Sequence, residues 1–124
     1  MTNTTPLVGQ VAWITGSSRG LGRVMAEELC ELGAKVAVHG PRPDSPKTFG
    51  EGESMEQVAR DIAAAGNGET MPVWGDMTEE DEVRRVAEEV RANWGQIDIL
   101  VCCAGGDIGA AGTAVGKGGR PEDD

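Results

Sequence analysis

The chain has 124 residues, a length that allows one domain with its own core. Its formal net charge of −10 argues against a nucleic-acid or membrane-surface partner, because such partners require a basic face. No apolar run approaches the roughly 18 residues of a membrane span. The N-terminus lacks the basic start and apolar stretch of a signal peptide, so we expect a cytoplasmic protein.

The first part of the chain alternates short apolar runs with a helical pattern. Residues 11–15 predict a strand covered on both faces, and residues 20–32 predict a helix that stops at Gly33. The apolar side of this helix comprises Leu21, Val24, Met25, Leu29 and Leu32. A second strand is predicted over residues 35–39, followed by a long loop over residues 40–53, which are rich in proline and glycine.

A second helix and a third strand follow this loop. Ser54 and Gln57 have the spacing of a capping box, which predicts a helix that ends at Gly66. The third strand is predicted over residues 69–74 and contains Pro72. Because proline is confined to strand edges in sheets, this strand should lie at the side of the sheet.

The last predicted elements are a third helix and a fourth strand. Thr78, followed by three acidic residues, is expected to cap the helix and Gly95 to end it. The helix carries an apolar stripe that predicts packing and comprises Val83, Val86, Ala87, Val90 and Trp94. Residues 97–103 predict the fourth strand, and this alternation indicates an α/β fold with a parallel sheet, right-handed crossovers and helices on both faces.

Composition changes after Cys103. Residues 1–103 are predicted to form the folded domain, whereas the Gly-rich residues 104–124 show no apolar period and are expected to be a loop or disordered tail. The three cysteines make no disulfide framework, and a single histidine, His39, excludes a zinc pattern. We expect reduced thiols buried as small apolar groups.

The connection from the first strand to the first helix carries the main functional signal. It contains glycines at positions 16, 20 and 22, between a predicted strand and a predicted helix. This arrangement presents backbone N–H groups and the positive end of a helix to a phosphate. Gly16 would permit the sharp turn, Gly20 the approach of a diphosphate, and Gly22 close packing of the helix on the sheet. A phosphate-loop NTPase is excluded, because Arg23 and Val24 follow Gly22 where that motif needs Lys and Ser or Thr.

The segment from Thr15 to Gly22 resembles the cofactor loop of the short-chain dehydrogenase/reductase family, and the likeness extends over about residues 8 to 110. It implies a Rossmann-type doubly wound parallel sheet with strand order 3-2-1-4, of which this chain holds the first half. The cofactor-binding residues it implies are Gly16, Ser18, Arg19, Gly20, Leu21, Gly22, Arg42, Asp76, Met77, Ala104 and Gly105.

Two further segments match the family. Asp76 corresponds to an acidic residue that accepts a hydrogen bond from the adenine amino group. The fourth strand typically ends Asn-Asn-Ala-Gly in the family, whereas this chain has cysteines at 102 and 103, which are weak hydrogen-bonding groups. The backbone turn at Ala104 and Gly105 is retained, and it would border the ribose and the nicotinamide.

Cofactor choice in the family depends on the end of the second strand. NAD-preferring members place an acidic residue there, and the matching position in this chain is Gly40. Arg19 and Arg42 could both reach a 2′-phosphate with bidentate geometry. We therefore expect NADP as the cofactor, with NAD as the alternative.

The family's catalytic serine, tyrosine and lysine have no counterpart, because the sequence contains no tyrosine. One interpretation is a truncated reductase, related to 3-oxoacyl-carrier-protein reductases, whose parent transfers a hydride between NADPH and a small-molecule carbonyl or alcohol. The alternative is a non-catalytic nucleotide-binding or regulatory module. The apolar fourth strand would leave an open edge in a free-standing module, which favours the first interpretation and predicts an inactive fragment that forms homo-oligomers.

Overall fold

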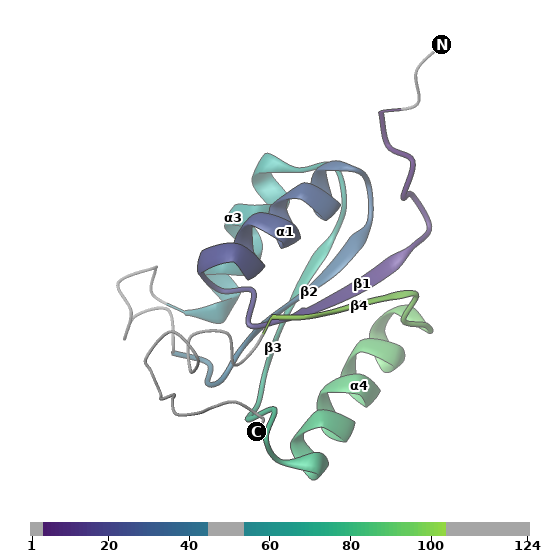
Figure 1. Cartoon of the computed structure of the whole chain (residues 1–124). Coiled ribbons are helices and arrows are strands. Elements are labelled where there is room, and N and C mark those ends of the chain that lie inside the picture. Colours follow the sequence, from purple (N-terminus) through teal and green to yellow (C-terminus); the bar gives the residue numbers. More distant parts are fainter. Residues whose placement is uncertain (1–3, 45–53, 104–124) are drawn as a thin grey trace, which may run out of the picture.

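The computed structural model describes residues 4–44 and 54–103, which form one parallel sheet with helices on both faces (Figure 1). Strands and helices alternate as the sequence predicts. In chain order they are β1 (Val11–Thr15), α1 (Gly20–Glu31), β2 (Lys35–Gly40), α3 (Met55–Ala65), β3 (Thr70–Trp74), α4 (Glu80–Trp94) and β4 (Ile99–Cys102). The tail predicted over 104–124, and residues 45–53 of the predicted loop, lie outside the described residues.

The four strands are all parallel and lie in the order β3-β2-β1-β4, which confirms the Rossmann-type order expected from the glycine loop. The central strand β1 pairs on both sides, so that Trp13 lies opposite Ala37 on β2 and Leu100 on β4. Pro72 lies in β3, which is the outer strand next to β2 in the described sheet. The prediction that its strand lies at the side of the sheet is therefore confirmed.

Side chains alternate between the two faces of the sheet, and each face has its own core. Ile14 and Val38 belong to the core that packs against α1 and α3, whereas Trp13 and Ala37 belong to the core that packs against α4. Figure 1 shows α1 and α3 on one side of the strands and α4 on the other. All five residues of β1 are buried, which explains its uninterrupted apolar sequence.

Helix α1 does not bury the whole apolar side that its sequence predicts. Leu21 and Val24 are 71% and 57% exposed, so their expected place on a packed face is wrong. The buried positions are Gly22, Ala26 and Cys30, which follow one another at four-residue intervals. At 3.6 residues per turn, Leu21 and Val24 point roughly 100° and 200° around the helix from Gly22. The small side chains decide which face approaches the sheet.

The helix ends agree with the sequence in all but one case. Ser54 caps α3, because its Oγ accepts a hydrogen bond from the Gln57 N–H at 3.2 Å. Gly95 ends α4 in the left-handed conformation at φ 83°. Thr78, in contrast, does not cap α4: the residue before the helix is Glu79, and it makes no side-chain capping bond. The Thr78 hydroxyl bonds to Asp76 instead, at 2.6 Å.

Strand β4 is shorter than predicted, and it brings two apolar side chains to the surface. Leu100 is 56% exposed, and Cys102 is exposed on the same side of the strand. Cys30 is buried and Cys103 is half-buried, and all three thiols are free. The expectation of buried thiols therefore holds for Cys30 and is wrong for Cys102. Leu100 lies opposite Trp13, on the α4 side of the sheet, but among the described residues this side of β4 contributes none to the core that packs against α4.

Residues 4–44 and 54–103 contain neither a helix suited to span a membrane nor a cluster of metal-binding side chains. No helix there has the length and hydropathy that a membrane span requires. The same residues do not gather three His, Cys, Asp or Glu side chains into a group that could bind a metal ion.

Candidate functional site

The predicted site residues gather where the parallel strands end. The carboxyl end of β1 leads into the glycine loop, that of β2 into Arg42, and that of β3 into Asp76 and Met77. β2 and β4 lie on opposite sides of β1, and the crevice at such a switch point is the usual ligand site of open α/β sheets. Ala104 and Gly105, which were also predicted to contribute, lie outside the described residues.

The glycine loop has the backbone conformation that its glycines allow. Gly16 and Gly20 have φ angles of 68° and 61°, in the left-handed region that side chains disfavour. A Cβ added to Gly20 would meet nothing within 4 Å, so this part of the loop faces open space. Helix α1 begins at Gly20, and the first N–H groups of a helix have no acceptor within it. The loop therefore offers backbone donors and a positive helix end to an anion.

Gly22 holds the start of α1 against the loop. A Cβ there would collide with the Gly16 carbonyl oxygen and would lie 3.0 Å from the Ser17 Cα. The sequence predicts close packing of the helix on the sheet, and the structure identifies the contact as the first turn of the loop itself. Of the other predicted residues, Ser18 is 3% exposed, Arg19 is half-buried and Leu21 is exposed.

His39, at the end of β2, bonds to two segments of the site. It is 2% exposed; its Nδ1 accepts the Gly16 N–H at 2.8 Å, and its Nε2 lies 2.9 Å from the Gly75 carbonyl oxygen. A carbonyl oxygen can only accept, so the proton is on Nε2 and the ring is neutral. The Ser17 hydroxyl donates to the Ile14 carbonyl at 2.7 Å and accepts the His39 N–H at 2.8 Å. The Ser17 N–H donates to the His39 carbonyl at 2.8 Å.

These bonds change which backbone N–H groups of the loop are available to a ligand. The N–H groups of Gly16 and Ser17 are used by His39, so the donors available to a ligand are those at the start of α1. Burial lowers the pKa of His39 below its ordinary value, against the smaller effect of the Gly75 hydrogen bond. On the sequence alone, His39 served only to exclude a zinc pattern. Its signal is a polar side chain near the end of an otherwise apolar buried strand.

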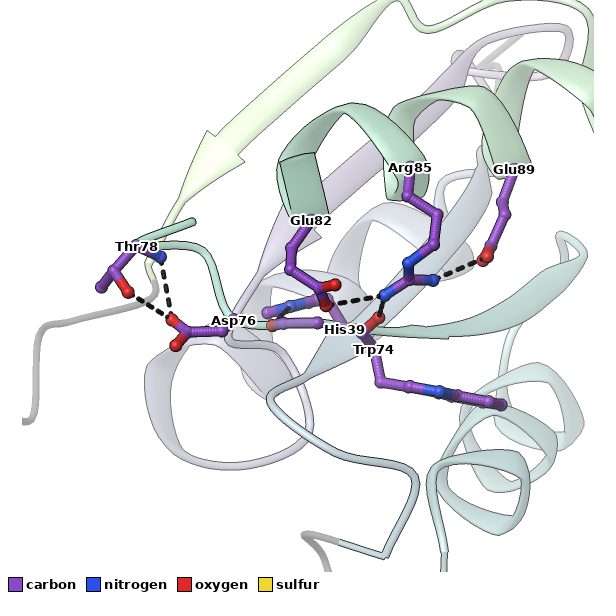
Figure 2. Close-up of polar contacts among 8 residues, drawn as sticks. His39, Trp74, Asp76, Thr78, Glu82, Arg85 and Glu89 are labelled. Atoms are coloured by element: carbon purple, nitrogen blue, oxygen red, sulfur yellow. Dashed lines mark hydrogen bonds and ion pairs between the residues drawn. The ribbon is translucent and has the colours of Figure 1, made fainter. Parts of the chain in front are cut away.

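Asp76 presents a charged carboxylate after β3. Its Oδ1 accepts the Thr78 hydroxyl at 2.6 Å and the Thr78 N–H at 2.9 Å, and these bonds lower the pKa of Asp76. In Figure 2 the second oxygen points away from Thr78. It makes no hydrogen bond with any residue that the structure describes, so it can accept one from a ligand. Met77 is half-buried against the core on the α4 side.

An arginine on α4 holds the end of β3 from which Asp76 projects. The guanidinium of Arg85 donates to the Trp74 carbonyl at 2.6 Å and pairs with Glu82 at 3.0 Å and Glu89 at 2.7 Å (Figure 2). Gly75 fits beneath this group, because a Cβ there would lie 2.9 Å from Arg85 Nη2. The turn carrying Asp76 is thereby held on one side by α4 and on the other by His39.

We expect Arg85→Ala to lower the free energy of unfolding by about 1–2 kcal/mol, because it removes a charged donor from the Trp74 carbonyl. Arg84→Ala is the matched control: Arg84 pairs with Glu80 on the same helix, both side chains are 74% exposed, and its loss should cost less than about 0.5 kcal/mol. Urea denaturation followed by tryptophan fluorescence measures both. Equal losses of stability in the two variants would show that the Arg85 side chain does not stabilise the end of β3.

Arg42, the second arginine expected to bind a 2′-phosphate, lies beyond β2. Arg42 Nε is 3.5 Å from Asp44 Oδ1, and the two side chains are 59% and 69% exposed. Gly40, at the position that decides cofactor choice in the family, is buried, and its carbonyl accepts the Gly75 N–H at 3.1 Å. The end of β2 therefore presents no carboxylate, and a guanidinium follows within two residues.

Comparison with known proteins identifies the family of this chain. The sequence profile of the short chain dehydrogenase family matches residues 10–116. Cyclohexanol dehydrogenase of Rhodococcus sp. (strain TK6) is 34% identical over 113 residues, which are 89% of this chain and 42% of that protein. Dehydrogenase/reductase SDR family member 1 of Homo sapiens is 38% identical over 97 residues, which are 77% of this chain and 28% of that protein.

Solved structures give the same result. The structure of a metagenomic short-chain oxidoreductase in complex with NADP has a TM-score of 0.62 and 35% identity, and the match covers 77% of this chain and 38% of that one. Hydroxysteroid dehydrogenase from Escherichia coli has a TM-score of 0.67 and 27% identity, with 81% and 38% covered. The chain thus spans less than half the length of these relatives. On the match over residues 10–116, it belongs to the short-chain dehydrogenase family.

Proposed function

We propose that this chain is the cofactor-binding part of an NADP-dependent oxidoreductase acting on the carbonyl or alcohol group of a small molecule. The observation that carries the proposal is the open left-handed turn at Gly20, which lies at the positive end of α1 and at the switch point of the sheet. The nicotinamide cofactor, when bound, supplies or accepts the hydride. The residues of this chain bind and orient it.

Each part of the site has a proposed role. The backbone N–H groups at the start of α1, with Ser18 and Gly20 beside them, would hold the diphosphate. The outward oxygen of Asp76 would accept the adenine amino group, with Met77 next to it. Leu21, which is 71% exposed, offers an apolar contact, and the residues after Cys103 would continue the site.

NADP is preferred to NAD in this proposal on electrostatic grounds. Gly40 occupies the place where a carboxylate would repel a 2′-phosphate, and Arg19 and Arg42 lie on the segments after β1 and β2. Guanidinium groups bind phosphate with charge-assisted, bidentate hydrogen bonds. Arg42 would exchange its exposed ion pair with Asp44 for the phosphate, at little cost because surface pairs contribute little.

We expect the 124-residue chain to bind NADPH more tightly than NADH in calorimetric titrations. Arg19→Ala and Arg42→Ala should each weaken NADPH binding by about 10-fold or more and leave NADH nearly unchanged, since a hydrogen bond to a charged group is worth about 1.5–3 kcal/mol. Arg91→Ala, which removes an exposed arginine of α4, is the charge-matched control. Tighter binding of NADH would contradict the cofactor preference. If a folded sample bound neither NADPH nor NADH, the proposed cofactor-binding function would be contradicted.

A non-catalytic nucleotide-binding module is the second candidate, favoured by the lack of a tyrosine in the sequence. The position of β4 as an outer strand of the described sheet, with Leu100 exposed, argues against it, because natural proteins protect such edges with charges, proline or a further strand. We therefore propose that the tyrosine, serine and lysine of the reductase belong to a longer protein and that these 124 residues alone do not turn over substrate. The same edge would support homo-oligomers of the fragment.

We also propose the subfamily, the substrate class and the cellular location of the longer protein. We propose that the longer protein resembles the 3-oxoacyl-carrier-protein reductases, with a small-molecule substrate and no nucleic-acid or membrane partner. The acidic composition, with 21 acidic against 11 basic residues, argues against a nucleic-acid or membrane-surface partner, and we propose a cytoplasmic location for the protein.

A further inference from the structure

We propose that His39 is a positioning residue for the cofactor site: its neutral imidazole fixes the glycine loop relative to the turn that carries Asp76. This inference rests on the proposed function. The ring bonds to Gly16 through Nδ1 at 2.8 Å and to the Gly75 carbonyl through Nε2 at 2.9 Å. One bonded residue begins the glycine loop, and the other immediately precedes Asp76.

The imidazole is suited to this task because it is rigid. Its two nitrogens are held at a fixed separation in an aromatic ring, so the two bonded backbone groups cannot move apart without breaking a hydrogen bond. The main chain of His39 adds two bonds to Ser17, and the adjacent Gly40 carbonyl accepts the Gly75 N–H. The end of β2 therefore bonds to both segments that would contact an adenine dinucleotide.

A purely packing role for this position would not need a histidine. The preceding residues of β2, Val36, Ala37 and Val38, fill the two cores with apolar side chains alone. An apolar side chain at position 39 would leave the Gly16 N–H and the Gly75 carbonyl without their present partner. A buried polar group left unpaired is costly, so the loop and the turn would shift to find other partners.

The bond to Gly16 requires an unprotonated Nδ1, so the bridge has a pH dependence. A protonated ring carries two donors and would oppose the Gly16 N–H with an N–H of its own. The charged side chains nearest to the Gly75 end of the bridge are Glu82 and Arg85 of α4, which lie against Gly75, and Asp76, which follows it in the chain. Arg19 belongs to the glycine loop, and Arg42 and Asp44 follow β2. Because burial lowers the pKa of His39, the unfolded chain takes up its proton first, so stability should fall as the pH drops below about 6.5. The folded chain should keep its neutral ring, and with it the nucleotide affinity, until the pH falls below the lowered pKa of His39.

The test compares three substitutions in the 124-residue chain. His39→Leu removes both ring bonds, His39→Asn retains an acceptor near the position of Nδ1, and His39→Gln retains a donor near the position of Nε2. We expect His39→Leu to weaken NADPH binding by about tenfold or more in calorimetry, and each amide variant to restore part of the affinity. Ile62→Val, a buried change in α3, controls for lost stability.

Two readouts separate positioning from a general loss of structure. Nitrogen-15 NMR of the imidazole should show the Nε2–H tautomer at pH 7. The free energy of unfolding should fall between about pH 7.5 and 5.5 more steeply in the wild type than in His39→Asn, which has no imidazole at position 39 and provides the baseline. An Nδ1–H tautomer, or unchanged NADPH affinity in His39→Leu, overturns the inference. Failure of the wild type to bind any nucleotide contradicts the proposed function itself.

Discussion

Gly22→Ala is expected to destabilise the chain by about 3 kcal/mol and to abolish nucleotide binding. The added Cβ would collide with the Gly16 carbonyl oxygen and lie 2.9 Å from the Gly16 carbonyl carbon. Both atoms belong to the backbone and cannot rotate away like a side chain, so the start of α1 must move off the loop. Overpacking of this kind typically costs 1–3 kcal/mol, and the displaced segment is the one that presents the N–H donors.

Gly20→Ala is the matched control within the same loop. Its Cβ would meet nothing within 4 Å, and its φ of 61° costs a non-glycine residue only about 1–2 kcal/mol. Gly20→Ala should therefore be more stable than Gly22→Ala and yet bind nucleotide poorly, because its methyl group would occupy the open space in front of the loop. Urea unfolding and NADPH calorimetry on both variants give the two comparisons. Equal stability of the two variants would contradict the packing argument.

The sequence predicted the elements of the fold because each one depends on local chemistry. The apolar run of β1 reflects burial on both faces, the Ser54 capping box began α3, and Gly95 ended α4. Pro72 correctly indicated an outer strand of the described sheet, since proline has no backbone N–H to donate to a neighbouring strand and is therefore confined to sheet edges. The strand order followed from the resemblance of the glycine loop to a known family.

The predictions that failed depend on specific contacts that a pattern of residue types does not show. Leu21 and Val24 fit an apolar stripe, but the tight approach of Gly22 to Gly16 turns them toward the surface. Thr78 is of a residue type that often caps helices, yet its hydroxyl donates its hydrogen bond to the carboxylate of Asp76 instead of capping α4. The bridge made by His39 joins residues 23 and 36 positions away in the sequence, and no local pattern predicts such a pair.

Ile14→Ala should cost about 2–5 kcal/mol, because Ile14 is fully buried and lies opposite Val38 on β2 and Val101 on β4. Ile14→Val removes one methylene and should cost about 0.5–1.5 kcal/mol, which provides a graded series. Leu100→Ala, on the neighbouring strand, removes a side chain that is 56% exposed and should cost less than about 0.5 kcal/mol. Urea denaturation measures all three variants, and a large loss in Leu100→Ala would show that β4 is covered in solution.

Ile14 should also affect nucleotide binding, because its carbonyl accepts the hydrogen bond from the Ser17 hydroxyl and its side chain belongs to the core that includes Ala26 of α1. Ile62→Ala makes a comparable truncation in α3 within the same core. If the loop is supported from β1, Ile14→Ala should weaken NADPH binding more than Ile62→Ala at matched stability, with calorimetry performed at a temperature where both remain folded. Equal affinities would mean that the His39 and Ser17 bonds hold the loop without help from the core beneath it.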